Sequence, residues 1–189
     1  MSYLLTTPSS VEPLSLTEAK AHLRFTSSDD DPYISTLIIA ARRLVEQRCG
    51  LCLLQQSWSI FHDQWPGDGI FKLQIHPVLS VADVVIYGED DTAATVDPSH
   101  YYVDSVSRPA RLVLRRGRVF PSPGRSANGI EVKLVAGFGA AADAVPQPIK
   151  QAMLIAIADW YANRGDVAAS QLPLTAVELL APYRSLRLA

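Results

Sequence analysis

Apolar residues recur at helical spacing in two long segments, Asp31–Gly50 and Pro148–Arg164. Side chains repeating every three to four positions share one helix face and can be buried together. The first segment has such a stripe at Ile34, Leu37, Ile38, Ala41, Leu44 and Val45. The second has one from Ile149 to Tyr161, and further apolar residues extend it most of the way round. We therefore expect Pro148–Arg164 to be the most buried helix and Asp31–Gly50 to pack against it.

Residues at the ends of these stripes indicate where helices begin and end. Asp31 is suited to cap a helix, with Pro32 at the first helical position, where its missing N–H costs nothing. Gly50 can adopt the left-handed conformation that ends a helix. Upstream, Ser15–Glu18 matches a capping box, which predicts a short helix ending near Phe25.

Between residues 53 and 138 the pattern changes to short β-rich runs separated by Pro, Gly, Asp and Asn. About six strands are predicted: 58–61, 70–75, 81–87, 101–103, 111–114 and 130–135. The fold class is therefore α+β, a small helical bundle with an antiparallel β-sheet inserted between the second and third helices. We expect one domain, with an arm and helices in 1–52, the β-rich insert in 53–138, and the long buried helix and a tail in 139–189.

The two ends of the chain carry weaker patterns. Met1–Pro13 is typical of an extended arm that orders only against something else. Near the other end, Thr175–Glu178 matches a second capping box, and Pro182 ends the helix that it begins. A helix of under two turns is marginal in water. Its apolar residues therefore need a groove, either on their own domain or on a partner.

Composition excludes several classes of function. The formal net charge is −2, so no global field attracts a polyanion such as DNA. No apolar run reaches the roughly 18 residues that span a bilayer. We expect a protein that is made in the cytoplasm and has no membrane partner. Two cysteines are too few for a disulfide framework.

Several short motifs invite a chemical interpretation, and none is convincing. Cys49–Cys52 is a C-x-x-C, but it follows the end of a helix, where the dipole opposes a thiolate. Gly137–Ala142 resembles a dinucleotide fingerprint, yet two prolines separate it from the next helix. Asp29–Asp31 is explained by a helix N-terminus, and the four histidines are scattered. We expect no catalytic residue, cofactor or metal, and a redox or nucleotide-binding enzyme is the weakest alternative.

One basic cluster remains open. Arg115, Arg116 and Arg118 lie close together in the sequence. They could form a solvated hairpin tip, or they could contact a phosphate or an acidic partner. No interleaved aromatic residues argue for base stacking.

The order of the segments is more informative than any single motif. They read LSLTEAKAHLR at 14–24, DDPYISTLIIAAR at 30–42, a helix end at 46–50, VAGFG at 135–139, VPQPIKQA at 145–152, WYANR at 160–164 and LLAPYR at 179–184. In this order and spacing the chain resembles the head–tail connector (adaptor) proteins of long-tailed phages. The resemblance is to the inserted-sheet variety of prophages and gene transfer agents. It covers nearly the full chain, and residues 53–138 match least.

The resemblance implies a structural role and no enzymatic activity. Family members form a ring, commonly dodecameric, beneath the portal protein in the neck of the particle, and they dock a stopper or tail-completion protein. Their C-terminal segment reaches into the portal. Carried over, that segment is Leu172–Leu188, and its candidate portal contacts are Leu172, Leu174, Val177, Leu179, Leu180, Pro182, Tyr183, Arg184 and Leu186. DNA would then cross the lumen without being read.

A ring also needs contacts between subunits. Arg42, Arg43, Glu46 and Arg48 form a charged helix face that could pair with a neighbour in a head-to-tail contact, or could simply be solvated. The leading hypothesis is thus a neck adaptor of a phage-like particle. The alternative is a DNA-binding accessory protein of packaging that uses Arg115, Arg116 and Arg118.

Overall fold

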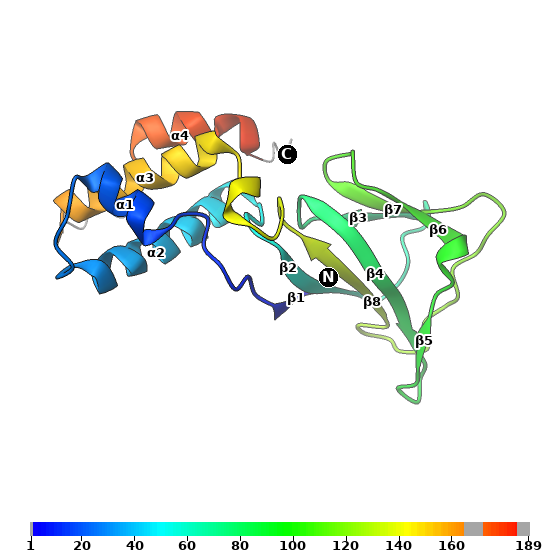
Figure 1. The fold of residues 1–189 in the computed structure, drawn as a ribbon. Coiled ribbons are helices and arrows are strands. Elements are labelled where there is room, and N and C mark those ends of the chain that lie inside the picture. Colours follow the sequence, from blue (N-terminus) through cyan, green and yellow to red (C-terminus); the bar gives the residue numbers. More distant parts are fainter. Residues whose placement is uncertain (1, 165–171, 185–189) are drawn as a thin grey trace. The chain divides into compact units, whose positions relative to one another are not determined.

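The computed structural model describes residues 2–164 and 172–184 of the chain. Its contacts divide the chain into two compact units, each shown in Figure 1. The sheet unit comprises Met1–Ser9 and Gln55–Phe138, and the helical unit comprises Ser10–Leu54 and Gly139–Ala189. Helices and antiparallel sheets together make an α+β fold, so the predicted fold class is confirmed. No helix in the described residues is long and apolar enough to cross a membrane.

The helical unit is built on α2 (Asp31–Cys49) and α3 (Gln147–Ala162), which pack against each other. The apolar stripe of α2 is buried, and so is that of α3, where Ile149, Met153 and Ile157 have no exposed surface. The expected pairing of these two helices is therefore confirmed. The shorter helices α1 (Leu16–Leu23) and α4 (Leu174–Leu180) also pack on α3.

The ends of the helices follow the predicted signals in some places and not in others. The capping box at α1 forms, because Ser15 Oγ accepts the Glu18 N–H at 3.1 Å and Glu18 Oε2 accepts the Ser15 N–H at 2.7 Å. Gly50 ends α2 with a φ of 66°. The cap of α2 is Asp30, not Asp31, and the capping box predicted at Thr175 is wrong, because α4 begins at Leu174 after Pro173.

Asp30 makes no side-chain cap bond because its carboxylate is engaged with the far end of α3. Tyr161 Oη donates to Asp30 Oδ2 at 2.6 Å, and Arg164 Nη2 donates to the same oxygen at 2.7 Å. The Arg164 guanidinium also lies over the rings of Tyr161, at 4.0 Å, and Tyr33, at 4.9 Å. These contacts join the start of α2 to the end of α3 by an ion pair and two cation–π interactions.

A second link joins α1 to α3. Lys150 Nζ, on a residue that is only 8% exposed, lies 2.9 Å from Glu18 Oε1. The pKa of Glu18 is lowered from 4.5 to about 2, first by the Ser15 backbone N–H and then by the Lys150 ammonium. The capping box and the ion pair thus share one carboxylate.

Because the folded pKa of Glu18 lies below its unfolded value, its contribution to stability is present above about pH 4.5 and is lost as the pH falls towards 2. We expect Glu18→Gln to lower the free energy of unfolding by about 1 kcal/mol near neutral pH, because the carboxylate is partly exposed and screened. Below the folded pKa of Glu18, where the carboxyl is protonated in both the folded and the unfolded protein, the two proteins should be equally stable. Thermal unfolding across this range tests the prediction, and a difference that does not change with pH contradicts it.

The sheet unit contains two antiparallel sheets rather than the single sheet expected. The strand order is β1-β2-β8-β4-β5 in one and β3-β7-β6 in the other. The strands are β1 (Ser2–Thr7), β2 (Gln56–His62), β3 (Ile70–Leu73), β4 (Val78–Tyr87), β5 (Ala93–Thr95), β6 (Tyr101–Asp104), β7 (Ala110–Leu114) and β8 (Ile130–Ala136). The six predicted strands are present, and β1 and β5 are additional.

Buried side chains from both sheets form the core of the sheet unit. Phe71 of β3 is 1% exposed, and its ring centroid lies 4.5 Å from that of His62 on β2. Trp65 packs edge-on against Phe71 at 6.2 Å and stacks on Phe120 at 3.9 Å. Its indole Nε1 donates to the Pro121 carbonyl at 2.8 Å. This aromatic cluster ties the long loop after β7 to both sheets.

Candidate functional site

The candidate portal contacts of the tail divide into an inward and an outward set. Leu172 and Leu180 are 8% and 2% exposed, and Ala176 beside them is fully buried. Leu174 is 74% exposed, and Pro182 and Arg184 are also exposed. The remaining described members are half-buried: Val177, Leu179 and Tyr183. Leu186 lies outside the described residues.

This division settles which groove the tail occupies in the free chain. The inward side chains of α4 pack within the helical unit, largely against α3. In the free chain, Leu172 and Leu180 therefore hold the short helix in place, which a helix of this length needs. The outward set is the part of the tail that is most exposed to a partner.

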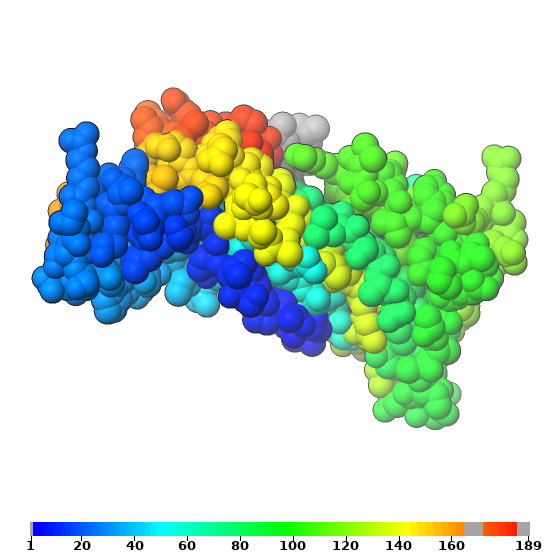
Figure 2. All heavy atoms as spheres, viewed as in Figure 1, coloured from blue at the N-terminus to red at the C-terminus, as the bar shows by residue number. Residues whose placement is uncertain are grey.

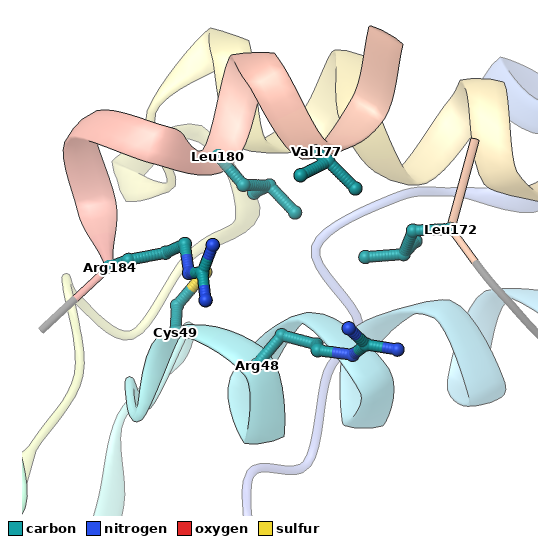
Figure 3. Close-up of a pocket in the computed structure, with 6 residues that line it drawn as sticks. All are labelled: Arg48, Cys49, Leu172, Val177, Leu180 and Arg184. Atoms are coloured by element: carbon teal, nitrogen blue, oxygen red, sulfur yellow. The ribbon is translucent and has the colours of Figure 1, made fainter. Parts of the chain in front are cut away.

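A small recess lies between α4 and the end of α2 (Figure 3). It encloses about 250 Å³ of space that includes the solvent at its mouth. Its apolar wall is made by Cys49, Leu172, Val177 and Leu180, and the guanidinium-bearing side chains of Arg48 and Arg184 flank it. Arg48 and Arg184 are far apart in the sequence, so no local pattern predicts that they share a site.

The C-x-x-C at this end of α2 is buried. Cys49 is 1% and Cys52 is 5% exposed, and neither forms a disulfide. Burial raises the pKa of the Cys49 thiol, and the Arg184 cation opposes that rise only in part. Raising the thiol pKa lowers its reactivity, because the thiolate is the nucleophile. Both cysteines are thus buried, and the raised pKa makes Cys49 a poor nucleophile.

The charged face of α2 is only partly available to a neighbouring subunit. Arg42 is engaged within the chain, where its Nε lies 2.7 Å from Glu12 Oε2 and its Nη1 lies 3.0 Å from Glu46 Oε2. Glu46 also accepts the Leu53 N–H. Arg43 and Arg48 are exposed. The subunit contact remains a prediction, and the exposed pair is the part of it that can reach another copy.

The basic cluster forms the turn after β7, where Gly117 has a φ of 79°. Arg115 is held in place, because its Nε donates to the Tyr101 carbonyl at 3.1 Å and its guanidinium lies over Tyr102. Arg116 and Arg118 are exposed and form no ion pair with any described residue. Two arginines therefore remain free at this tip for an anionic partner.

Strand β1 is a surface that sequence reasoning missed. All six of its residues are exposed, including Tyr3 at 42%, Leu4 at 54% and Leu5 at 41%. It is paired with β2 on one side and is the edge strand of its sheet. The sequence signal was the absence of any charged residue in Ser2–Thr7, which is unusual for a strand with an open edge.

The described residues offer no built site for a metal ion or a nucleotide. They contain no cluster of His, Cys, Asp and Glu suited to hold a metal. The glycine-rich stretch that resembles a dinucleotide fingerprint is followed by a short 3-10 segment, Ala142–Ala144, before α3 begins at Gln147. A helix N-terminus therefore does not follow the glycines directly, as phosphate binding of that kind requires.

Neither the protein-family models nor the curated proteins include a match to this chain. Solved structures do match over 100% of this chain and 98% of each matched chain. One is a chain in the neck of an empty gene transfer agent particle, computed with C6 symmetry, at 23% identity and a TM-score of 0.84. Another belongs to the virion of a native gene transfer agent particle, at 23% identity and a TM-score of 0.83. A third is from the neck of a native gene transfer agent particle, computed with C12 symmetry, at 22% identity and a TM-score of 0.80. The likeness establishes a shared fold along the whole chain.

Proposed function

We propose that the chain is a structural component of the neck of a phage or phage-like particle, where it forms a ring and acts as a head–tail adaptor. The observation that carries the proposal is the full-length fold shared with chains of gene transfer agent necks. Those structures were computed with C6 and C12 symmetry, and we infer a ring of copies for this chain too. A closed ring requires head-to-tail contacts between unlike surfaces of one copy and the next.

The proposed partners are the portal protein on one side and a stopper or tail-completion protein on the other. We assign the portal contact to the outward set of the tail, with Leu174 and Arg184 at its centre. Leu174 is the best anchor, because an apolar side chain that is 74% exposed gains most from being covered. We assign the contact between copies to Arg43 of α2 and to strand β1. Leu4 and Leu5 lie on opposite faces of that strand, so a neighbour could cover either.

Mixing the purified chain with the portal protein of the same particle tests the proposal. We expect negative-stain images to show an added ring on the portal, and size-exclusion chromatography to show co-elution. The free chain can be a monomer, because a tail and an arm that contact partners need not form a ring alone. Portal rings that gain no density and elute without the chain would contradict the proposed function.

The alternative is a DNA-binding accessory protein, and the observation that favours it is the free Arg116 and Arg118 at an exposed turn. Against it stands the formal net charge of −2. A gel-shift assay on the full chain and on Arg116→Gln/Arg118→Gln distinguishes the two. Binding through phosphate contacts would weaken steeply with salt and would require these arginines.

A further inference from the structure

The recess between α2 and α4 combines an apolar wall with two unpaired cations. Its wall consists of Cys49, Leu172, Val177 and Leu180, which are buried or half-buried. Arg48 comes from the last turn of α2, and Arg184 follows the 3-10 segment Ala181–Tyr183 that continues α4. Figure 3 shows the Arg184 side chain directed towards Cys49 and the Arg48 side chain directed below Leu172. All of these residues belong to the helical unit.

Neither arginine has an acidic partner among the described residues. Other cations of the helical unit do have one: Lys20 with Asp31, Arg42 with Glu12 and Glu46, Lys150 with Glu18, and Arg164 with Asp30. The carbonyl end of α2 favours a cation nearby, which explains why Arg48 is tolerated there. It does not satisfy the several N–H donors that each guanidinium carries. Both side chains are exposed and can turn those donors towards a ligand.

We propose that this recess, which we call the tail recess, binds an acidic segment of a partner protein, with an apolar side chain against the wall and one or two carboxylates on Arg48 and Arg184. The proposal rests on the proposed function, in which the tail is the partner-binding part of the chain. Charge complementarity selects the partner, because a guanidinium binds a carboxylate through two parallel hydrogen bonds. The apolar wall favours a protein segment over DNA, whose backbone presents charged phosphates and no apolar side chain.

The tail recess also accounts for the position of the outward set. Arg184 lines the recess after the end of α4, and Leu174 is exposed in the first turn of that helix. A partner segment that fills the recess could extend to Leu174 without displacing the buried Leu180. Binding then leaves the tail docked on its own body and avoids the cost of exposing its apolar face.

Two synthetic peptides test the inference on the full-length chain, acetyl-LEALDA-amide and its neutral counterpart acetyl-LQALNA-amide. We expect the acidic peptide to shift the methyl resonances of Val177 and Leu180 at low salt, and the neutral peptide to shift them far less. In Arg48→Gln/Arg184→Gln the Kd of the acidic peptide should rise by at least about tenfold. Both arginines are exposed, so this variant should fold normally, which an unchanged Tm verifies.

The matched control is Arg24→Gln, which removes another exposed arginine of the helical unit that does not line the recess. It should leave the Kd unchanged. The inference would be overturned if the two peptides bound equally well, or if the control variant lost as much affinity for the acidic peptide as the double variant. It would also be overturned if a DNA duplex, and not the acidic peptide, shifted the methyl resonances. A ring on the portal without acidic-peptide binding would overturn the inference alone. Peptide binding without any portal contact would contradict the proposed function alone.

Discussion

Replacing Leu180 by aspartate is expected to release α4 from the helical unit. Leu180 is 2% exposed, and a carboxylate buried there without a partner is strongly disfavoured. The helix has seven residues and is held by few side chains, so it should leave its site before α2 and α3 separate. Release uncovers Cys49, whose alkylation by iodoacetamide should accelerate by at least about tenfold. Mass spectrometry of the modified peptide distinguishes Cys49 from Cys52.

The matched control is Leu174→Asp on the outward side of the same helix. It should leave Cys49 protected while weakening the portal contact, because it places a charge where an apolar anchor is proposed. Leu180→Asp should weaken the contact as well, through loss of the docked tail. Slow alkylation in Leu180→Asp would show that α4 does not cover Cys49, and rapid alkylation in Leu174→Asp would show that Leu174 also holds the helix in place. Together the two substitutions distinguish residues that hold the tail on the helical unit from residues that contact a partner. Deletion of the whole tail would remove both kinds of residue at once.

Phe71→Ala is expected to cost the sheet unit about 3–5 kcal/mol of its free energy of unfolding. Phe71 is 1% exposed and packs against His62 and Trp65, so its removal leaves a cavity where both sheets meet the loop after β7. Urea denaturation followed by tryptophan fluorescence measures the loss. Lys72→Ala, at the neighbouring exposed position, should change the free energy of unfolding little. A loss in Phe71→Ala below about 1 kcal/mol would contradict this account of the core.

The same substitution has a second readout. Burial lowers the pKa of His62, whose Nε2 is buried and has no hydrogen-bond partner among the described residues. Removing the Phe71 ring lets water approach that nitrogen. The pKa of His62 should then rise towards its usual value, and NMR titration of the imidazole measures it. An unchanged pKa would mean that the cavity collapses without admitting water.

The helices could be predicted well because their signals are local. The Ser15–Glu18 capping box and the Gly50 terminator act within one turn, and the stripes of α2 and α3 need only a 3.6-residue repeat. Thr175 is not the cap because Pro173 already caps α4, and a local motif does not show which of two adjacent starting points the helix uses. Asp30 replaced Asp31 because Tyr161 and Arg164, distant in the sequence, bind its carboxylate.

The sheets and the tail recess depend on contacts between distant segments, which local sequence patterns do not predict. Six β-rich runs of the sequence predict strands. Their division into two sheets depends on hydrogen bonds between segments that are distant in the sequence, such as β2 and β8. Strand β5 contains only Ala93, Ala94 and Thr95, too short for an alternating pattern. The recess needs Cys49, Leu172 and Arg184 in one place, which only the packing of α4 brings about.

The uncharged edge of β1 is expected to lower the solubility of the free chain. Natural edge strands are commonly guarded by a lysine or a proline, and Ser2–Thr7 contains neither. Concentrated samples are therefore prone to pair edge to edge into soluble aggregates or precipitate, before any partner is added. Leu4→Lys places a charge on this edge strand at a position that is 54% exposed, and we expect it to improve solubility. If β1 is a contact between copies, that same lysine blocks assembly, so preparations should be compared with and without it.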